Sequence, residues 1–306
     1  MRPTVLALPG NAALAARLAH ELGARLGLLE VRRFPDGESY VRIGSAIAGR
    51  AVVLAATLDR PDEKLLPLML TAATARELGA GSIGLVAPYL PYLRQDRRFR
   101  SGEAVSARHF SHLLAEPLDW IVTVDPHLHR LHALTEVYPI PTKSVTAAPR
   151  LAAWVRDHVP APILIGPDEE SRQWVARVAA AVGAPWEVFR KRRLGDESVS
   201  EELPDLGAHR DRTPVLVDDI ISSGTTMIQS ARALVRAGFT APWCVAVHGI
   251  FADGAYARLN ASGVAGVVTS NTIAHPSNAI DVHDLLAAAA SRQLVGAAAI
   301  QGSRSW

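Results

Sequence analysis

Two carboxylates and a hydroxyl-rich loop stand together in the run Val217-Asp218-Asp219-Ile220-Ile221-Ser222-Ser223-Gly224-Thr225-Thr226. We predict a buried strand over residues 215–217 before the acids and, after the loop, a helix that begins at residue 226 or 227 and ends at residue 237. Backbone N–H groups in such a turn, together with the helix N-terminus, suit a phosphate. Carboxylates would repel phosphate but suit the cis-diol of a ribose or a bridging Mg²⁺. The run therefore predicts a sugar-phosphate site; the alternative is a helix capped by Thr225 or Thr226 without a ligand.

Cationic side chains at two other places could stabilise phosphate charge. Only three of the 32 basic residues are lysines, and one of them stands in the run Lys191-Arg192-Arg193. Four arginines lie within residues 94–100, where a nucleic-acid patch or an exposed salt-bridge cluster is the alternative. Asp96 and the single aromatic Phe99 offer no stacking platform for nucleic-acid bases. We therefore expect these runs to bind a small phosphorylated molecule and not nucleic acid.

Short apolar runs alternate with segments of helical period along the whole chain. Strands are predicted at residues 4–8, 51–55, 83–87, 120–124, 163–165, 215–217, 243–248 and 266–270. Helices are predicted at residues 12–26, 65–78, 104–114, 170–181 and 226–237, with a closing helix in the C-terminal tail. This alternation favours an α/β fold with mostly parallel sheets flanked by helices, in which ligands lie beyond the carboxyl ends of the strands.

Length and composition indicate the number of domains and exclude several classes of protein. A length of 306 residues suggests two domains, and the interruption Pro139-Ile140-Pro141 suggests a division into residues 1–143 and 144–306. A net charge of +2, with 49% hydrophobic residues, excludes a disordered protein and a general basic field. The single cysteine, Cys244, excludes an intrachain disulfide framework. With no apolar run long enough for a membrane span, we expect a soluble cytoplasmic protein.

Several motifs together resemble the ribose-phosphate pyrophosphokinase family, which makes phosphoribosyl diphosphate (PRPP). The loop of residues 222–226 resembles its PRPP-binding loop. Five further segments match the family in order: Arg33-Phe34-Pro35-Asp36-Gly37-Glu38, Pro88-Tyr89 with Tyr92-Leu93-Arg94-Gln95-Asp96-Arg97-Arg98, Thr123-Val124-Asp125-Pro126-His127, Gly166-Pro167-Asp168 and Lys191-Arg192-Arg193. The resemblance extends from residue 1 to about residue 285. It implies two type I phosphoribosyltransferase-like domains, the first holding the ATP motifs and the second the ribose 5-phosphate loop.

The resemblance also implies an activity and residue roles. The family transfers the diphosphoryl group of ATP to the C1 hydroxyl of ribose 5-phosphate, giving PRPP and AMP. Implied catalytic residues are Lys191 and Arg193. Implied ATP-binding residues are Phe34, Asp36, Gly37, Glu38, Arg94 and Gln95. Implied ribose 5-phosphate-binding residues are Asp218, Asp219, Ser222, Ser223, Gly224, Thr225 and Thr226.

The cofactor implied by the resemblance is Mg²⁺, associated with His127 and Asp168. In the family the adenine site is completed across a subunit interface, which implies a homo-oligomer, either a dimer or a hexamer built from dimers. No nucleic-acid or membrane partner is expected.

The chain departs from the family pattern at places that bear on substrate binding. Ser222 replaces the usual acid of the loop, Thr225 replaces a glycine, and Glu169-Glu170 replaces small residues after Asp168. Two alternatives therefore stay open: a non-catalytic homologue that binds nucleotide and regulates a partner, and a diphosphotransferase acting on a different sugar phosphate.

Overall fold

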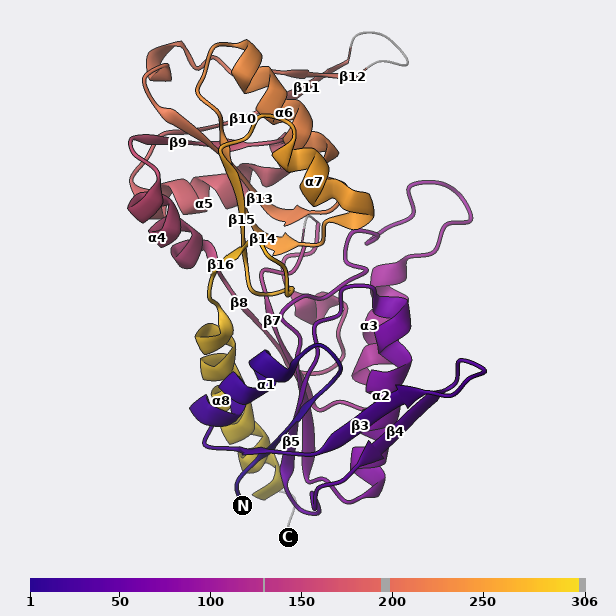
Figure 1. Ribbon diagram of the computed structural model, residues 1–306. Helices are drawn as coiled ribbons and strands as arrows, with labels where there is room; N and C mark the ends of the chain where they lie inside the picture. The colour runs from indigo at the N-terminus through magenta and orange to yellow at the C-terminus, as the bar shows by residue number, and fades with distance from the viewer. Residues whose placement is uncertain (129, 194–198, 303–306) are drawn as a thin grey trace. The chain divides into compact units, whose positions relative to one another are not determined.

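The structure, a computed structural model, describes residues 1–128, 130–193 and 199–302 and contains two compact units (Figure 1). The first unit consists of Met1–Val145 and the C-terminal helix, and the second of Thr146–Val282. Each is built on a six-stranded sheet in which all the strands run parallel. The expected α/β fold with parallel sheets is therefore confirmed.

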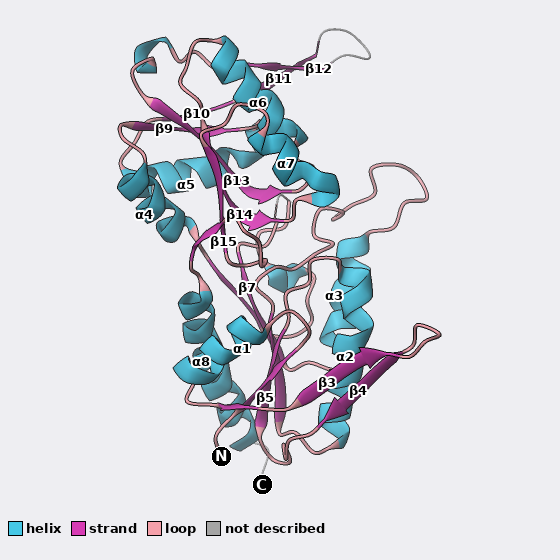
Figure 2. Ribbon diagram, viewed as in Figure 1, coloured by secondary structure: helices cyan, strands magenta, loops and turns pink. Residues whose placement is uncertain are grey.

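The first unit has the strand order β2-β1-β5-β6-β7-β8. Its elements are β1 (Thr4–Ala7), α1 (Ala12–Glu21), β2 (Arg25–Leu26), β3 (Leu29–Arg33), β4 (Ser39–Ile43), β5 (Ala51–Ala55), α2 (Pro61–Glu77), β6 (Ser82–Val86), α3 (Ser106–Ala115), β7 (Trp120–Val124), β8 (Thr142–Val145) and α8 (His283–Gly302). Helices α2 and α3 cover one face of the sheet, and α1 and α8 cover the other (Figure 2). Strands β3 and β4 form a separate antiparallel hairpin.

The second unit has the strand order β10-β9-β13-β14-β15-β16, with α4 and α5 on one face and α6 and α7 on the other. Its elements are α4 (Ala148–His158), β9 (Pro162–Gly166), α5 (Arg172–Val182), β10 (Trp186–Val188), β11 (Arg190–Arg193), β12 (Val199–Glu202), β13 (Thr213–Ile221), α6 (Thr225–Arg236), β14 (Trp243–Gly249), α7 (Ala255–Asn260), β15 (Gly266–Ser270) and β16 (Asn278–Ile280). Strands β11 and β12 pair as an antiparallel ribbon outside the main sheet.

In both sheets the order in which strands are added reverses at an equivalent strand, β1 in the first unit and β9 in the second. In the first unit the chain leaves β1 toward β2 and later returns to β5 on the other side of β1. In the second unit β9 is flanked in the same way by β10 and β13. Ligands of open parallel sheets bind beyond the carboxyl ends of the strands at this switch point. The fold therefore predicts ligand sites at the carboxyl ends of β1 and β5 and of β9 and β13.

The eight predicted strands are all present, but the end of one of them was wrong. Residues 215–217 were expected to end before the two acids, whereas β13 continues through Asp218 and Asp219 to Ile221. The reason is that β13 keeps its parallel pairing with β14 as far as Ile221 opposite Gly249. The loop before α6 is correspondingly short.

The C-terminal helix α8 packs on the first unit, which differs from the expected division at residues 143 and 144. Helix α8 contacts α1, β6 and β7, and its residues Leu286, Ala287 and Ala290 are buried. This contact is tertiary, so position along the chain did not reveal it. None of the described helices is both long enough and apolar enough to cross a membrane.

Candidate active site

Two carboxylates at the switch point of the second unit, those of Asp168 and Asp219, act electrostatically on a third, that of Asp218. Asp168 follows β9, and Asp218 and Asp219 lie on the neighbouring strand β13. The Asp219 backbone N–H donates to Asp218 Oδ1 at 2.9 Å. Burial, and then the negative charges of Asp219 and Asp168, raise the pKa of Asp218 well above its usual range. A cation or a pair of sugar hydroxyls beside Asp218 would relieve this unfavourable charge.

The hydroxyl-rich loop, residues 222–226, follows directly at the end of β13. Gly224 takes a left-handed conformation (φ 72°, ψ 1°) and precedes the first turn of α6. Thr225 lies within the helix, so it does not occupy a position that requires a positive φ. Among the described hydrogen bonds, none engages the backbone N–H groups of Ser222, Ser223 or Gly224. These N–H groups and the α6 N-terminus form a local environment suited to a phosphate.

The turn after β9 holds Asp168 in place. Its carboxylate accepts a hydrogen bond from the Ser171 backbone N–H at 3.1 Å, and the Ser171 hydroxyl donates to the Asp168 carbonyl at 2.6 Å. A side chain at Gly166 would lie 2.2 Å from Ser171 Oγ, so only glycine allows this close packing. Glu169 lies 3.9 Å from Arg172, an exposed pair that partly offsets its charge.

The proposed adenine residues lie at the tip of the β3–β4 hairpin. The Phe34 N–H donates to Glu38 O at 2.8 Å, and Gly37 closes the turn at φ 95°. Asp36 accepts from the Glu38 N–H at 3.2 Å. The Phe34 ring is 39% exposed, and the Arg32 guanidinium lies 4.7 Å from its centroid. An exposed aromatic ring beside carboxylates is a suitable surface for a nucleobase.

Three further predicted residues follow the carboxyl ends of β6 and β7. Arg94 is exposed, and Gln95 Oε1 accepts from the Ser106 hydroxyl at 2.8 Å at the start of α3. His127 follows β7 after Asp125, whose φ of 29° turns the chain. These three residues belong to the first unit, while Asp168 belongs to the second.

The predicted catalytic residues lie on β11, where Lys191 pairs with Glu201 and Arg193 with Val199 in the backbone register. Their side chains, and residues 194–198, lie outside what the structure describes. The described geometry therefore brings together Asp168, Asp218, Asp219 and the hydroxyl-rich loop. In the described part of the chain, no group of three or more His, Cys, Asp or Glu side chains is arranged to hold a metal ion.

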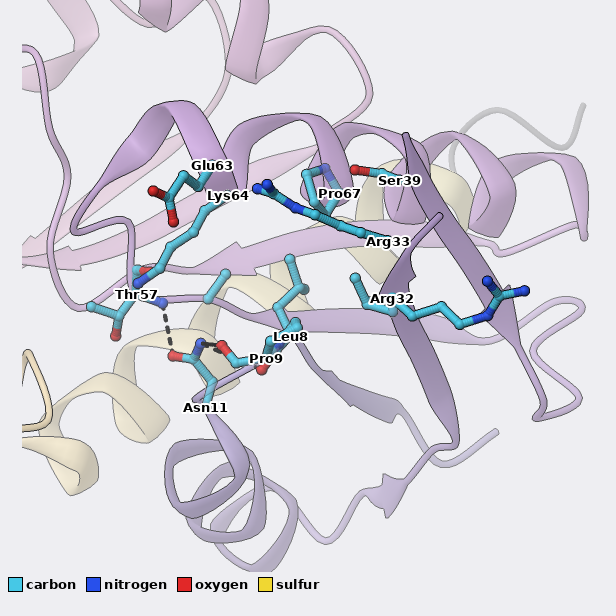
Figure 3. A pocket seen from close by; sticks show the side chains of 12 residues that line it. Leu8, Pro9, Asn11, Arg32, Arg33, Ser39, Thr57, Glu63, Lys64 and Pro67 are labelled. Carbon is cyan, nitrogen blue, oxygen red and sulfur yellow. Dashed lines mark hydrogen bonds between the residues drawn. The ribbon is translucent and has the colours of Figure 1, made fainter. Parts of the chain in front are cut away.

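A cavity of about 260 Å³ lies at the switch point of the first unit, under the β3–β4 hairpin (Figure 3). Asn11 joins the two strand ends, because its Oδ1 accepts from the Thr57 N–H at 2.8 Å and its Nδ2 donates to Pro9 O at 3.0 Å. The Lys64 ammonium donates to the Thr57 carbonyl at 3.1 Å and to Asp59. The Lys64 ammonium thus contacts the loop after β5, which is the topological counterpart of the loop after β13 in the second unit.

Sequence reasoning missed the loop that packs against residues 222–226. The backbone N–H of Ala252 donates to Ser222 O at 3.1 Å, and Arg258 Nη2 donates to Ser223 O at 3.1 Å. The two contacting segments are about 30 residues apart in the sequence, and only the adjacency of β13 and β14 brings them together. The parallel strand order was the signal that could have indicated this contact.

The sequence matches two family models. Residues 4–116 match the N-terminal domain of ribose phosphate pyrophosphokinase, and residues 136–284 match the phosphoribosyl transferase domain. The crystal structure of phosphoribosylpyrophosphate synthetase from Mycobacterium smegmatis is similar in fold, with a TM-score of 0.82 at 24% identity over 97% of this chain and 99% of that one. The predicted fold of two phosphoribosyltransferase-like domains is therefore confirmed.

Sequence relatives agree over nearly the whole chain. The ribose-phosphate pyrophosphokinase of Methanopyrus kandleri is 35% identical over 280 residues, which are 91% of this chain and 95% of that protein. That of Methanothermobacter thermautotrophicus is 33% identical over 275 residues, which are 90% of this chain and 95% of that protein. The two matched family models together cover most of both units, and the second includes the ends of β9 and β13. This chain belongs to the ribose-phosphate pyrophosphokinase family.

Proposed function

We propose that the protein is a ribose-phosphate diphosphokinase, which transfers the diphosphoryl group of ATP to the C1 hydroxyl of ribose 5-phosphate and releases AMP. The observation that carries this proposal is the second unit's switch point. There Asp218 and Asp219 lie on β13, next to β9, which ends just before Asp168. The hydroxyl-rich loop follows β13, and no described hydrogen bond engages the backbone N–H groups of its residues 222–224. Relatives named for this activity match most of the chain and favour the enzyme over both the regulatory homologue and an enzyme for another sugar.

The roles follow from the chemistry of each group. The N–H groups of residues 222–224, with the hydroxyls of Thr225 and Thr226, bind the 5-phosphate. Asp218 and Asp219 accept hydrogen bonds from the ribose hydroxyls, which offsets the unfavourable charge on Asp218. This arrangement fixes the sugar, so that its C1 hydroxyl meets the β-phosphorus of ATP in line.

The nucleotide is held by residues of the first unit. Phe34 stacks on the adenine ring, and Asp36 and Glu38 accept from its amino group. Arg94 and Gln95 bind the phosphates and the adenine side of ATP. Lys191 and Arg193 stabilise the charge that develops on the transferred group in the transition state.

Mg²⁺ is the implied cofactor, with His127 and Asp168 as its protein partners. When bound, the ion neutralises charge on the phosphate oxygens. Asp168 offers the hard oxygen ligand that Mg²⁺ prefers, and His127 adds a nitrogen. Two protein ligands are enough for Mg²⁺, because this ion usually keeps several bound waters and is also coordinated by phosphate oxygens of its substrate. The enzyme is further proposed to be a cytoplasmic homo-oligomer, either a dimer or a hexamer built from dimers, because in the family the adenine site is completed across a subunit interface.

The test is to incubate the protein with ATP, Mg²⁺ and ribose 5-phosphate and to separate the products by chromatography. Equimolar AMP and PRPP are expected, and neither should form without the sugar phosphate. No AMP despite measurable ATP binding would contradict the proposal, and a panel of other sugar phosphates would then identify a different acceptor. Light scattering of the same preparation tests the oligomeric state.

A further inference from the structure

The loop after β14, residues 250–254, contacts the main-chain carbonyl groups at the end of β13. The Ile250 N–H donates to Ile221 O at 3.0 Å, and the Ala252 N–H donates to Ser222 O at 3.1 Å. The guanidinium of Arg258, on α7, donates from Nη2 to Ser223 O at 3.1 Å and from Nη1 to Asp253 O. Three successive carbonyls, those of residues 221–223, are therefore held from one side.

Holding these carbonyls fixes the direction of the N–H groups that follow them. In a trans peptide the C=O of one residue and the N–H of the next point in opposite directions, and the described chain has no cis peptide bond. With the carbonyls of Ile221, Ser222 and Ser223 turned toward residues 250–258, the N–H groups of Ser222, Ser223 and Gly224 must point away from them. These are the same N–H groups that no described hydrogen bond engages.

The bracing loop, residues 250–254, is itself held in an uncommon conformation. Phe251 and Asp253 have φ values of 49° and 50°, in the left-handed region that residues other than glycine rarely adopt. The Phe251 ring is buried, with its centroid 4.4 Å from that of His275 and 5.2 Å from that of Tyr256. A side chain at Gly249 would lie 2.5 Å from the Phe251 ring. Such conformations persist where the surroundings over-determine them, and they cluster at functional sites.

We propose that the bracing loop and Arg258 position the hydroxyl-rich loop for phosphate binding, and that Arg258 is a positioning residue. The inference rests on the proposed function and names how the 5-phosphate site is held open. Arg258 acts through the Ser223 carbonyl and does not itself touch the sugar phosphate. Because it holds the loop equally in the ground state and in the transition state, its loss should weaken binding more than turnover.

The test compares Arg258→Ala and Arg258→Lys with Arg232→Ala, which removes an exposed arginine of α6 that has no described contact. Loss of one hydrogen bond to the loop predicts a rise of about 3- to 10-fold in KM for ribose 5-phosphate for Arg258→Ala. We expect kcat within about twofold of the unmodified enzyme, an intermediate KM for Arg258→Lys, and no change for Arg232→Ala. Thermal melts of all three variants separate a binding effect from unfolding.

Titration with inorganic phosphate provides a second measurement that does not depend on turnover. The dissociation constant for phosphate should rise by the same factor in Arg258→Ala and should stay unchanged in Arg232→Ala. The inference is overturned if Arg258→Ala matches Arg232→Ala in both measurements, if kcat falls while KM is unchanged, or if the unmodified protein binds no phosphate. An unmodified protein that binds phosphate but forms no PRPP would refute the proposed function alone.

Discussion

Replacing Gly224 with alanine separates the stability of the hydroxyl-rich loop from its ability to bind phosphate. Gly224 has a φ of 72°, and the left-handed region costs a residue with a side chain about 1–2 kcal/mol. The added Cβ would lie 3.5 Å from the Ala255 Cβ, which is ordinary van der Waals contact. We therefore expect the free energy of unfolding to fall by about 1–2 kcal/mol, from backbone strain alone.

The same substitution should reduce affinity for the sugar phosphate. If the chain relieves the strain by rotating the peptide, the Gly224 N–H turns away from the phosphate. One lost hydrogen bond to a charged group costs about 1.5–3 kcal/mol, or about 10- to 150-fold in affinity. The assay is KM for ribose 5-phosphate at saturating ATP, together with chemical denaturation of the same preparation.

Gly183→Ala is the matched control. Gly183 ends α5 with a φ of 77°, and an added Cβ would meet nothing within 4 Å. Gly183→Ala should lose similar stability without a change in KM. If Gly224→Ala loses stability yet keeps the KM of the unmodified enzyme, the N–H groups of this loop do not bind the phosphate, and the assignment of the site is refuted.

Three further substitutions test other parts of the account. Since burial raises the pKa of Asp218 in the folded state, the contribution of this group to stability falls as the pH rises above about 3.8. Asp218→Asn should therefore be more stable by about 0.5–2 kcal/mol at pH 7, with a difference that shrinks toward pH 4 in thermal melts; a constant difference would contradict this cause. Gly84→Ala should cost about 3 kcal/mol or more in chemical denaturation, because its Cβ would lie 2.0 Å from the Trp120 ring. Lys191→Ala should lower kcat about 100-fold or more with little change in ATP affinity by calorimetry, and an unaffected kcat would exclude the role given to β11.

Local sequence predicted the elements whose burial is a property of the segment itself. The runs that form β5, β7 and β14 are apolar except for Thr123 and His248, because parallel strands between two helical layers are buried on both faces. The β3–β4 hairpin was not predicted, since the polar sequence of Leu29–Arg33 carries no such pattern. It was visible only as a motif resembling the family's adenine segment.

Features that depend on contacts between distant segments of the chain could not be predicted from the sequence. Asp218 and Asp219 were recognised as site residues, but their place inside β13 depends on how far β14 continues beside it. Arg258 gave no local signal, because its contact with the hydroxyl-rich loop follows from strand order and not from spacing. The packing of α8 on α1 likewise depends on a contact between the two ends of the chain.

The most direct test follows the phosphorus atoms of ATP through the reaction. With ATP labelled at the γ-phosphorus, Mg²⁺ and ribose 5-phosphate, we predict that the label appears in PRPP in a 1:1 ratio with AMP. Transfer of both terminal phosphoryl groups as one unit is the only outcome consistent with a diphosphokinase. Label recovered as inorganic phosphate or in a singly phosphorylated product, with ADP as the nucleotide, would contradict the account.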